Sequence, residues 1–264
     1  MTEATRYRAV LAYVGTAFHG WQIQKNAPRT VQAALEDALE RFAGAPVRAL
    51  AAGRTDAGVH AEGQVVHFDL PVERGDEETR DGVNALLPWD VRVLEARRAP
   101  PDFDARRDAR WKEYLYRWSR APVIAPRDSP FTASISAGAD PARMREGARR
   151  LEGTRDFGVF AVRRPARGSS VRTLFCVSIR EEGAGIEALF RGDGFLRGMV
   201  RSLCGLLAEV SRGRFAPERV EELLATGDRR LLAPKAPAKG LTLLRVGYGE
   251  EVCGPRSPVL GPVN

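Results

Sequence analysis

Residues 51–70 read AAGRTDAGVHAEGQVVHFDL and combine a polar, glycine-containing loop with a strand. The end of this stretch alternates, so that Val66, Phe68 and Leu70 share one face, as in a half-buried β-strand. Residues 47–51, just before the loop, form a second short β-compatible run. The stretch therefore predicts two strands with the motif GRTDAGVH between them.

Asp56 is the residue of this loop that can do chemistry most directly. An aspartate in water is ionised at neutral pH, so its carboxylate can attack an electrophilic carbon without a separate base. Burial favours the neutral acid, and a guanidinium such as that of Arg54 opposes this effect. Gly53 and Gly58 allow a tight loop and a close approach to a ligand. The alternative is that Thr55 and Asp56 only cap their own turn, and the spacing alone favours this alternative.

The rest of the chain predicts helices and strands in mixed order. Helical spacing with Thr30 as N-cap and Gly44 just past the end predicts a helix over 30–42. Asp140 and Pro141 open another helix, which Gly153 closes. The other expected helices are 79–87, 195–210 and 217–225, and the expected strands are 8–14, 47–51, 64–70, 91–96, 111–118, 171–179, 186–190 and 241–248. This order indicates an α+β fold rather than the regular βαβα pattern of a parallel sheet.

The chain is expected to form two halves. Residues 119–139 are rich in Pro, Ser, Ala and Gly and show no clear period, which predicts a linker. The N-terminal half is then 1–118 and carries the GRTDAGVH loop, the C-terminal half is 140–250, and 251–264 form an extended tail. Each half contains strands and helices in comparable amount, although no sequence repeat relates the halves.

The composition favours a polyanionic partner. The formal net charge is +7 over 264 residues, which points first to nucleic acid and second to an acidic membrane. Only 4 of the 41 basic residues are lysines, so a codon bias toward arginine is an alternative cause of the charge.

Cysteine usage and hydropathy predict the compartment. Cys176, Cys204 and Cys253 lie far apart and form no CxxC, which argues for a reducing compartment and against a disulfide framework or a zinc site. The first ten residues lack the apolar core of a signal peptide, and no apolar run approaches the roughly 20 residues of a membrane span. We therefore expect a cytoplasmic protein that does not span a membrane.

The run WKEYLYRW at 111–118 places Lys112, Tyr114, Tyr116 and Trp118 on one face of a strand. An aromatic ring in such a position can stack on an unpaired base, at roughly 1–3 kcal/mol per base. The alternative is a core strand with an ordinary aromatic face, and the pattern alone favours it. At least one of these side chains is expected to serve packing.

The three histidines do not have the spacing of a common metal site. His67 lies on the alternating strand and is expected to be structural. His19 and His60 lie beside glycines in loops, where each can approach a ligand. No P-loop, serine-centred elbow or dinucleotide-binding glycine pattern is present, so we expect no metal site and no nucleotide-cofactor motif.

Several stretches taken together resemble the TruA family of tRNA pseudouridine synthases, nearly end to end. One block alone is weak, but eight in family order are specific. Two positions depart from the family pattern: Val14 stands where an acid is usual, and Gly198 where a polar residue is frequent. The matching blocks are YVGTAFHGWQIQ (13–24), AAGRTDAGVHAEGQVVHF (51–68), VNALLPWDVRV (83–93), FDARRDARWKEYLYRW (103–118), RDFGVFA (155–161), VRTL (171–174), GFLRGMVRSLCGLL (194–207) and APKAPAKGLTLL (233–244).

The resemblance implies two similar halves around a largely antiparallel central sheet, the pseudouridine synthase fold, and a homodimer. It implies a basic cleft for the anticodon arm of tRNA and conversion of uridine to pseudouridine at tRNA positions 38 to 40, without metal or organic cofactor. Carried over by position, Asp56 is expected to be the catalytic nucleophile and Arg54 its charge partner. Tyr114 is expected to stack on the uracil and move a proton. Other residues expected to bind substrate or line the cleft are Gln22, His60, Val171, Arg172, Arg197 and Arg201.

The first hypothesis is therefore a tRNA-uridine isomerase with Asp56 as nucleophile. A second hypothesis is a non-catalytic tRNA-binding or RNA-folding module whose loop is only structural. It rests on the basic charge and the aromatic strand. A third, in which the backbone of GRTDAGVH binds a nucleotide phosphate, lacks the supporting strand-to-helix glycine pattern. Attack at C6 of the ring and attack at the sugar are not distinguished by the sequence.

Overall fold

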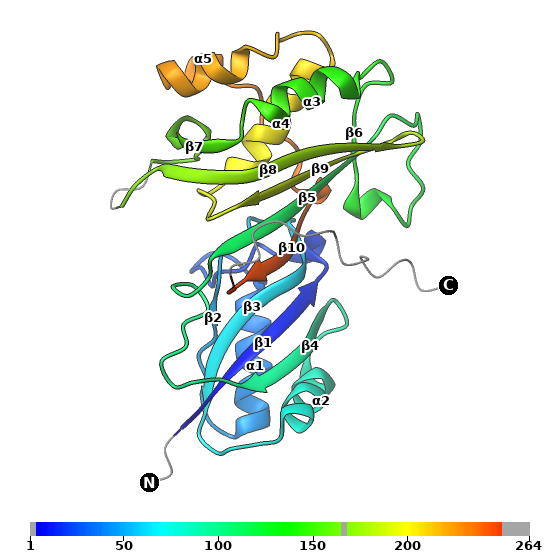
Figure 1. The fold of residues 1–264 in the computed structure, drawn as a ribbon. Coiled ribbons are helices and arrows are strands. Elements are labelled where there is room, and N and C mark those ends of the chain that lie inside the picture. Colours follow the sequence, from blue (N-terminus) through cyan, green and yellow to red (C-terminus); the bar gives the residue numbers. More distant parts are fainter. Residues whose placement is uncertain (1–3, 165–167, 250–264) are drawn as a thin grey trace.

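The computed structural model describes residues 4–164 and 168–249, which fold around one mixed β-sheet (Figure 1). The main path of the sheet runs β4-β1-β3-β10-β5-β9-β8-β7, while β2 pairs with β3 and β6 pairs with β5. The strands are β1 (Thr5–Tyr13), β2 (Leu50–Ala51), β3 (His60–Leu70), β4 (Val91–Arg98), β5 (Trp111–Ser119), β6 (Ala133–Ser134), β7 (Gly153–Asp156), β8 (Val171–Glu182), β9 (Gly185–Gly192) and β10 (Leu241–Gly247).

The helices fall into two groups along the sheet. In Figure 1, α1 and α2 lie beside β1, β3 and β4, whereas α3, α4 and α5 lie at the end formed by β8 and β9. Within the described part of the chain, none of these helices has the length and apolar character that crossing a membrane requires. The α-helices are α1 (Val31–Ala43), α2 (Asp76–Leu86), α3 (Pro141–Arg149), α4 (Met199–Ser211) and α5 (Arg219–Thr226), and short 3-10 helices are η1 (Gly15–Ala17), η2 (Ser129–Phe131), η3 (Gly158–Phe160), η4 (Arg229–Leu231) and η5 (Ala238–Gly240).

The predicted α+β class with a largely antiparallel central sheet is confirmed. Among the described residues, only the pairings of β10 with β3 and of β5 with β6 are parallel. Strand β10 comes late in the chain but lies between β3 and β5, near the middle of the sheet. The C-terminal part of the chain therefore completes the sheet beside the strand that follows the GRTDAGVH loop.

Local signals explain where the helices begin and end. The Thr30 hydroxyl accepts a hydrogen bond from the main-chain N–H of Ala33 at 3.3 Å, and Gly44 closes α1 with a φ of 71°. The Asp140 carboxylate accepts from the N–H of Ala142 at 2.8 Å and so caps α3. Both N-caps are as the sequence predicts, but α3 already ends at Arg149, and Gly153, which was expected to close it, begins β7.

Some predicted boundaries are wrong. The helix expected over 195–210 begins only at Met199, because Gly198 takes a left-handed φ of 73° that a helix cannot contain. A β-carbon on Gly198 would lie 2.7 Å from a methyl group of Val162, so this departure from the family pattern fits its surroundings. The helix expected over 79–87 begins earlier, at Asp76, and His60 opens β3 instead of lying in a loop.

The expected linker contains ordered structure. Residues 119–139 include η2 and β6, and β6 pairs with the end of β5. The boundaries proposed for the two halves stay a prediction. The tail expected over 251–264 lies outside the described residues.

Helix α4 packs directly against the segment that leads to β10. The N–H of Ala236 donates to the carbonyl of Arg201 at 3.0 Å, and Arg201 Nε donates to the carbonyl of Ala236 at 2.9 Å. Gly205 lies in the middle of α4, where a β-carbon would come within 2.0 Å of the Pro234 carbonyl oxygen. The absence of a side chain at 205 is what allows this close approach.

Replacing Gly205 tests this packing against helix propensity. Propensity alone favours alanine over glycine inside a helix by roughly 1 kcal/mol. Forcing a methyl group against the Pro234 carbonyl costs about 1–3 kcal/mol or more, because the contact is with backbone. We expect Gly205→Ala to lower the free energy of unfolding in urea. Gly138→Ala is the control, since its β-carbon would meet nothing closer than 3.9 Å. A more stable Gly205→Ala protein would contradict the packing.

Candidate active site

The GRTDAGVH loop is held from one side by the segment that follows β1. The Trp21 N–H donates to the Thr55 carbonyl at 3.1 Å, and the Gly58 N–H donates to the Phe18 carbonyl at 3.2 Å. Gly20 has a φ of 87°, and a β-carbon there would lie 2.6 Å from the Thr55 carbonyl oxygen. Only glycine meets both conditions without strain, so the two loops are in main-chain contact.

Side chains of β1, β3 and β5 also hold the GRTDAGVH loop in place. The hydroxyls of Tyr13 and Thr55 are hydrogen-bonded at 2.9 Å, and burial raises the pKa of Tyr13 to about 12, so its phenol is neutral. Gln64 Nε2 donates to the Gly53 carbonyl at 2.8 Å, and Lys112 Nζ donates to the Ala52 carbonyl at 2.8 Å. These bonds fix the residues on both sides of Arg54.

Asp56 is thereby placed opposite two arginines from the C-terminal half. Its carboxylate lies 3.5 Å from Nη1 of Arg201 and 3.7 Å from Nε of Arg197. Arg201 is 22% exposed and is anchored to the Ala236 carbonyl, whereas the side chain of Arg197 is 78% exposed. The Asp56 side chain is itself 23% exposed, so it remains open to a ligand.

The predicted pairing of Arg54 with Asp56 is wrong. Arg54 is exposed, and among the described residues the guanidinium groups within ion-pair distance of Asp56 are those of Arg197 and Arg201. The loop does not turn back far enough to bring Arg54 onto the carboxylate. From the sequence, Arg197 and Arg201 are expected only as substrate contacts, and the one signal that relates them is their spacing of four residues.

Tyr114 lies on β5, between Phe190 of β9 and Leu243 of β10. Its side chain is buried, and its ring meets that of Phe195 edge-on at a centroid distance of 5.0 Å. Burial raises the pKa of Tyr114, and the neighbouring Tyr13 and Asp56 groups raise it further. The phenol is therefore protonated at neutral pH and lies within the electrostatic reach of Asp56.

His60 has a structural place instead of the predicted substrate contact. It is 2% exposed, Nδ1 accepts from the Gly15 N–H at 3.0 Å, and Nε2 donates to the Pro130 carbonyl at 3.0 Å. Burial lowers the pKa of His60 and favours this neutral tautomer. Both ring nitrogens are thus occupied by main-chain groups, which connect η1 to η2. The structural assignment of His67 is confirmed, since it is buried and its Nδ1 accepts from the Ala105 N–H.

The remaining predicted contacts lie near the loop but do not touch Asp56. The Gln22 amide donates to Gln32 Oε1 at 2.7 Å, at the start of α1. Arg172 donates to the carbonyls of Ser169 and Val171 and faces Gly194. Its positive charge also acts on Lys112. Their roles as substrate contacts stay predictions.

Lys112 was placed on the aromatic strand by the sequence, but its link to the loop was missed. Burial, together with the nearby charges of Arg106 and Arg172, lowers the pKa of Lys112 to about 8. Its amino group bonds the Ala52 carbonyl, directly before Gly53. A sequence gives no signal for such a contact between residues 60 positions apart.

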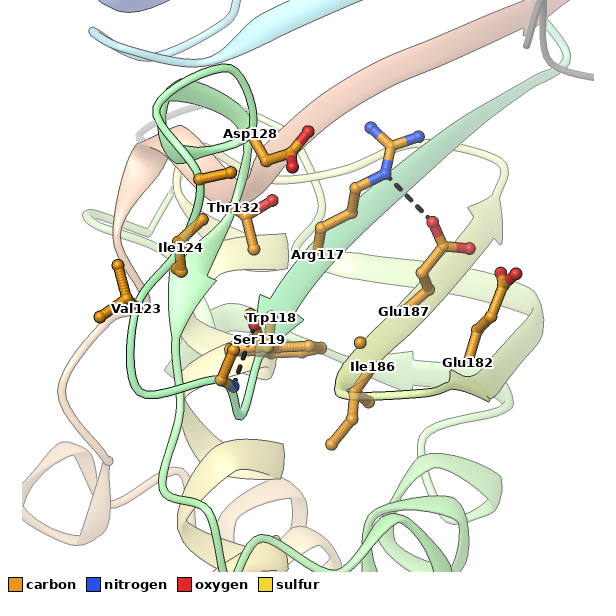
Figure 2. A pocket seen from close by; sticks show the side chains of 13 residues that line it. Arg117, Trp118, Ser119, Val123, Ile124, Asp128, Thr132, Glu182, Ile186 and Glu187 are labelled. Carbon is orange, nitrogen blue, oxygen red and sulfur yellow. Dashed lines mark hydrogen bonds and ion pairs between the residues drawn. The ribbon is translucent and has the colours of Figure 1, made fainter. Parts of the chain in front are cut away.

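A cavity among the described residues lies away from Asp56. It has a volume of about 340 Å³ and lies beside β5 and β9, where Arg117 and Glu187 form an ion pair at 3.1 Å (Figure 2). None of the predicted site residues lines it. Within residues 4–164 and 168–249, no group of three or more His, Cys, Asp or Glu side chains is arranged to hold a metal ion. The candidate site is therefore the surroundings of Asp56, outside this cavity.

Comparison with known proteins gives consistent results. The family model described as tRNA pseudouridine synthase matches residues 9–108 and 148–249. The chain is 45% identical over 251 residues to the tRNA pseudouridine synthase A of Solidesulfovibrio magneticus, covering 92% of this chain and 91% of that protein. It is 42% identical over 253 residues to that of Geobacillus kaustophilus, covering 93% and 95%. It is 40% identical over 247 residues to that of Listeria innocua, covering 92% and 99%.

Among solved structures, a chain of a Cbf5-Nop10-Gar1 complex aligns over 92% of this chain and 50% of its own length. The TM-score is 0.35 and the sequence identity is 13%.

The lowered pKa of Lys112 predicts a specific pH dependence of stability. Between pH 8 and the ordinary lysine range, the unfolded chain binds a proton that the folded chain has released, so the free energy of unfolding rises with pH. Relative to Lys112→Met, the wild-type chain should therefore gain roughly 1 kcal/mol per pH unit in this window. All other titratable groups are shared by the two proteins. Urea unfolding at pH 7.5, 8.5 and 9.5 measures the difference, and a difference that does not change with pH would contradict the burial of the amino group.

Proposed function

This chain belongs to the tRNA pseudouridine synthase family, and we propose that it isomerises uridine at positions 38 to 40 of the tRNA anticodon arm with Asp56 as the nucleophile. The family makes it an isomerase that modifies tRNA. The observation that carries the finer proposal is the placement of Asp56. It is the partly exposed carboxylate of a rigid loop, faced by Arg197 and Arg201 from the other half of the chain.

The reaction needs a carboxylate that is both ionised and open to the substrate. The guanidinium of Arg201 lies 3.5 Å from the carboxylate and can hold it in a fixed orientation. The loop carries Asp56 on main-chain contacts with Gly20 and Trp21, so the carboxylate needs no large rearrangement to meet a base. This combination favours the catalytic proposal over a loop that only binds tRNA.

The chemistry is a balanced rearrangement within one nucleotide. The C1′–N1 glycosidic bond breaks, the uracil turns while bound, and a C1′–C5 bond forms. The hydrogen on C5 leaves as a proton, and N1 gains a proton. The Asp56 carboxylate can begin this sequence by attack at C6 of the ring or at C1′ of the sugar, and the proposed placement serves both routes.

Tyr114 is proposed as the ring that supports the uracil. Its phenol is protonated at neutral pH, so it can donate a hydrogen bond or a proton but does not act as a general base from the outset. A uridine in the anticodon stem must leave the base stack, at a cost of a few kcal/mol. Stacking on Tyr114 and attraction of the flanking phosphates to Arg197 offset that cost. We further propose that the protein is a homodimer and is located in the cytoplasm, as expected from the sequence.

Asp56→Asn tests the nucleophile. The amide keeps the shape of the side chain but cannot form the covalent bond, so tritium release from uracil-labelled tRNA should fall by a factor on the order of 10⁴ or more. Binding of tRNA should stay near that of wild type, because the loop backbone is unchanged.

The matched control is Asp37→Asn, an exposed carboxylate on α1 that should leave turnover unchanged. Substantial tritium release by Asp56→Asn would refute the nucleophile. Wild-type protein that binds tRNA but leaves every uridine unchanged would instead indicate a non-catalytic binding module.

The two arginines at Asp56 are expected to contribute unequally. Arg201 is mostly buried and anchored, so Arg201→Gln should lower the single-turnover rate at saturating enzyme by about 100-fold. Arg197 is largely exposed, and exposed pairs contribute little, so Arg197→Gln should lower it less than about fivefold. Equal effects of the two variants, or an unaffected Arg201→Gln, would contradict the assignment.

A further inference from the structure

Trp89 is the exposed tryptophan of this chain. Its side chain is 77% exposed, whereas Trp21, Trp111 and Trp118 are at most 9% exposed. It lies in the turn between α2 and β4, and the chemistry proposed for Asp56 does not use it. An isolated surface aromatic is common, so its meaning depends on how it is held and on what surrounds it.

The turn that carries Trp89 is fixed on both sides. The Val91 N–H donates to the Pro88 carbonyl at 3.1 Å, and Arg92 Nη1 donates to the same carbonyl at 2.6 Å. The next residue, Asp90, is buried and accepts two hydrogen bonds from Arg29, each of 2.8 Å. The indole is therefore presented to solvent by an ordered backbone, and a ligand that stacks on it loses little affinity to ordering the protein.

Trp89 lies at the same end of the sheet as the catalytic loop. Tyr13 pairs with Val91 of β4 on one side and with Ala61 of β3 on the other. Neighbouring strands are about 4.8 Å apart, so these two strand beginnings are separated by about 10 Å. The Val14 N–H also donates to the Asp90 carbonyl at 3.0 Å, at the start of the segment that holds the GRTDAGVH loop. The turn that carries Trp89 and the GRTDAGVH loop therefore precede two strands that both pair with β1 at the same end of the sheet.

The charge around Trp89 suits a polyanion. Arg92 is exposed, its hydrogen bonds go to main-chain carbonyls, and no ion pair joins it to a carboxylate within the part of the chain that the structure describes. The acidic charge of Asp90 is matched by Arg29. Lys25, in the same segment as Arg29, is exposed. A flat aromatic ring beside uncompensated cations is the arrangement that binds single-stranded RNA.

We propose that Trp89 and Arg92 form a subsite for an unpaired nucleotide of the tRNA other than the reacting uridine. The base stacks on the indole of Trp89, and its phosphate faces the guanidinium of Arg92. This subsite rests on the proposed function, since it places the same tRNA across both positions. It binds RNA without taking part in the chemistry.

Tryptophan fluorescence reports on the subsite directly, because acrylamide reaches the exposed indole far better than the three buried ones. In the wild-type chain, saturating tRNA should reduce the acrylamide quenching constant by at least half. In Trp89→Phe the quenching constant should be low from the start, and tRNA should not change it. A wild-type constant that tRNA leaves unchanged would overturn the proposal.

Kinetics test the contribution of the subsite to binding. Loss of one stacked base weakens binding by a factor of about 5 to 150, so Trp89→Ala should raise the KM for tRNA by this factor and leave kcat unchanged. Trp89→Phe should restore most of the loss, because phenylalanine keeps a stacking face. The matched control is Val123→Ala, which removes another exposed apolar side chain, 80% exposed, from the cavity of Figure 2 and should leave KM unchanged. An unchanged KM in Trp89→Ala would overturn the proposal.

The two proposals can fail separately. Protection of Trp89 by tRNA in a protein that forms no pseudouridine would refute the proposed function and support the subsite. Pseudouridine formation with no effect of Trp89→Ala would refute the subsite alone. A third outcome is that, without RNA, the acrylamide quenching constant of the wild-type protein falls as the protein concentration rises. A second copy of the chain would then cover Trp89, and this would also overturn the RNA subsite.

Discussion

The close packing of Gly20 against the backbone of Thr55 is the constraint on which the site depends. A β-carbon at position 20 would lie 2.6 Å from the Thr55 carbonyl and 3.1 Å from the N atom of Ala57, so the two loops touch through their main chains. Because this contact fixes the loop, the side chain of Asp56 points to a defined place. That place is beside α4, where Arg201 is held by Ala236. Small residues at a few positions therefore determine the geometry of the charged ones.

A second, buried group of charged residues holds the central strands β5, β9 and β10 in register. Glu113 of β5 is fully buried. Its carboxylate accepts one hydrogen bond of 2.8 Å from Nε of Arg191 on β9 and another of 2.8 Å from Nη2 of Arg245 on β10. Glu113 directly precedes Tyr114 in the sequence, so the two side chains lie on opposite faces of the sheet. Loss of either arginine would leave the Glu113 charge buried with fewer partners and would destabilise the fold. These ion pairs therefore hold β5, β9 and β10 in their register next to Tyr114. The late strand β10 thereby connects the C-terminal segment to the loop of the first half.

The fold was more predictable from the sequence than the site. Alternation and capping residues predict β3, α1 and α3, because these signals are local and depend on neighbours in the chain. The start of α4 was misplaced, because the left-handed Gly198 interrupts an apolar pattern that continues through it. The sequence points to Asp56 and Tyr114, whose roles stay proposals, and it suggests Arg54 as the charge partner of Asp56 because Arg54 is near in the sequence. The true partners, Arg197 and Arg201, come from more than 140 residues away, and only the packing of α4 shows this.

The central claim is that a uridine turned out of the anticodon stem lies between Asp56 and Tyr114. A crystal structure of the Asp56→Asn chain with a tRNA anticodon arm tests it most directly. We expect the target uracil to be out of the stack with its ring against Tyr114, and the side chain at position 56 to be within about 3.5 Å of C6 or C1′. A target uridine still paired in its stem, or one bound away from position 56, would contradict it.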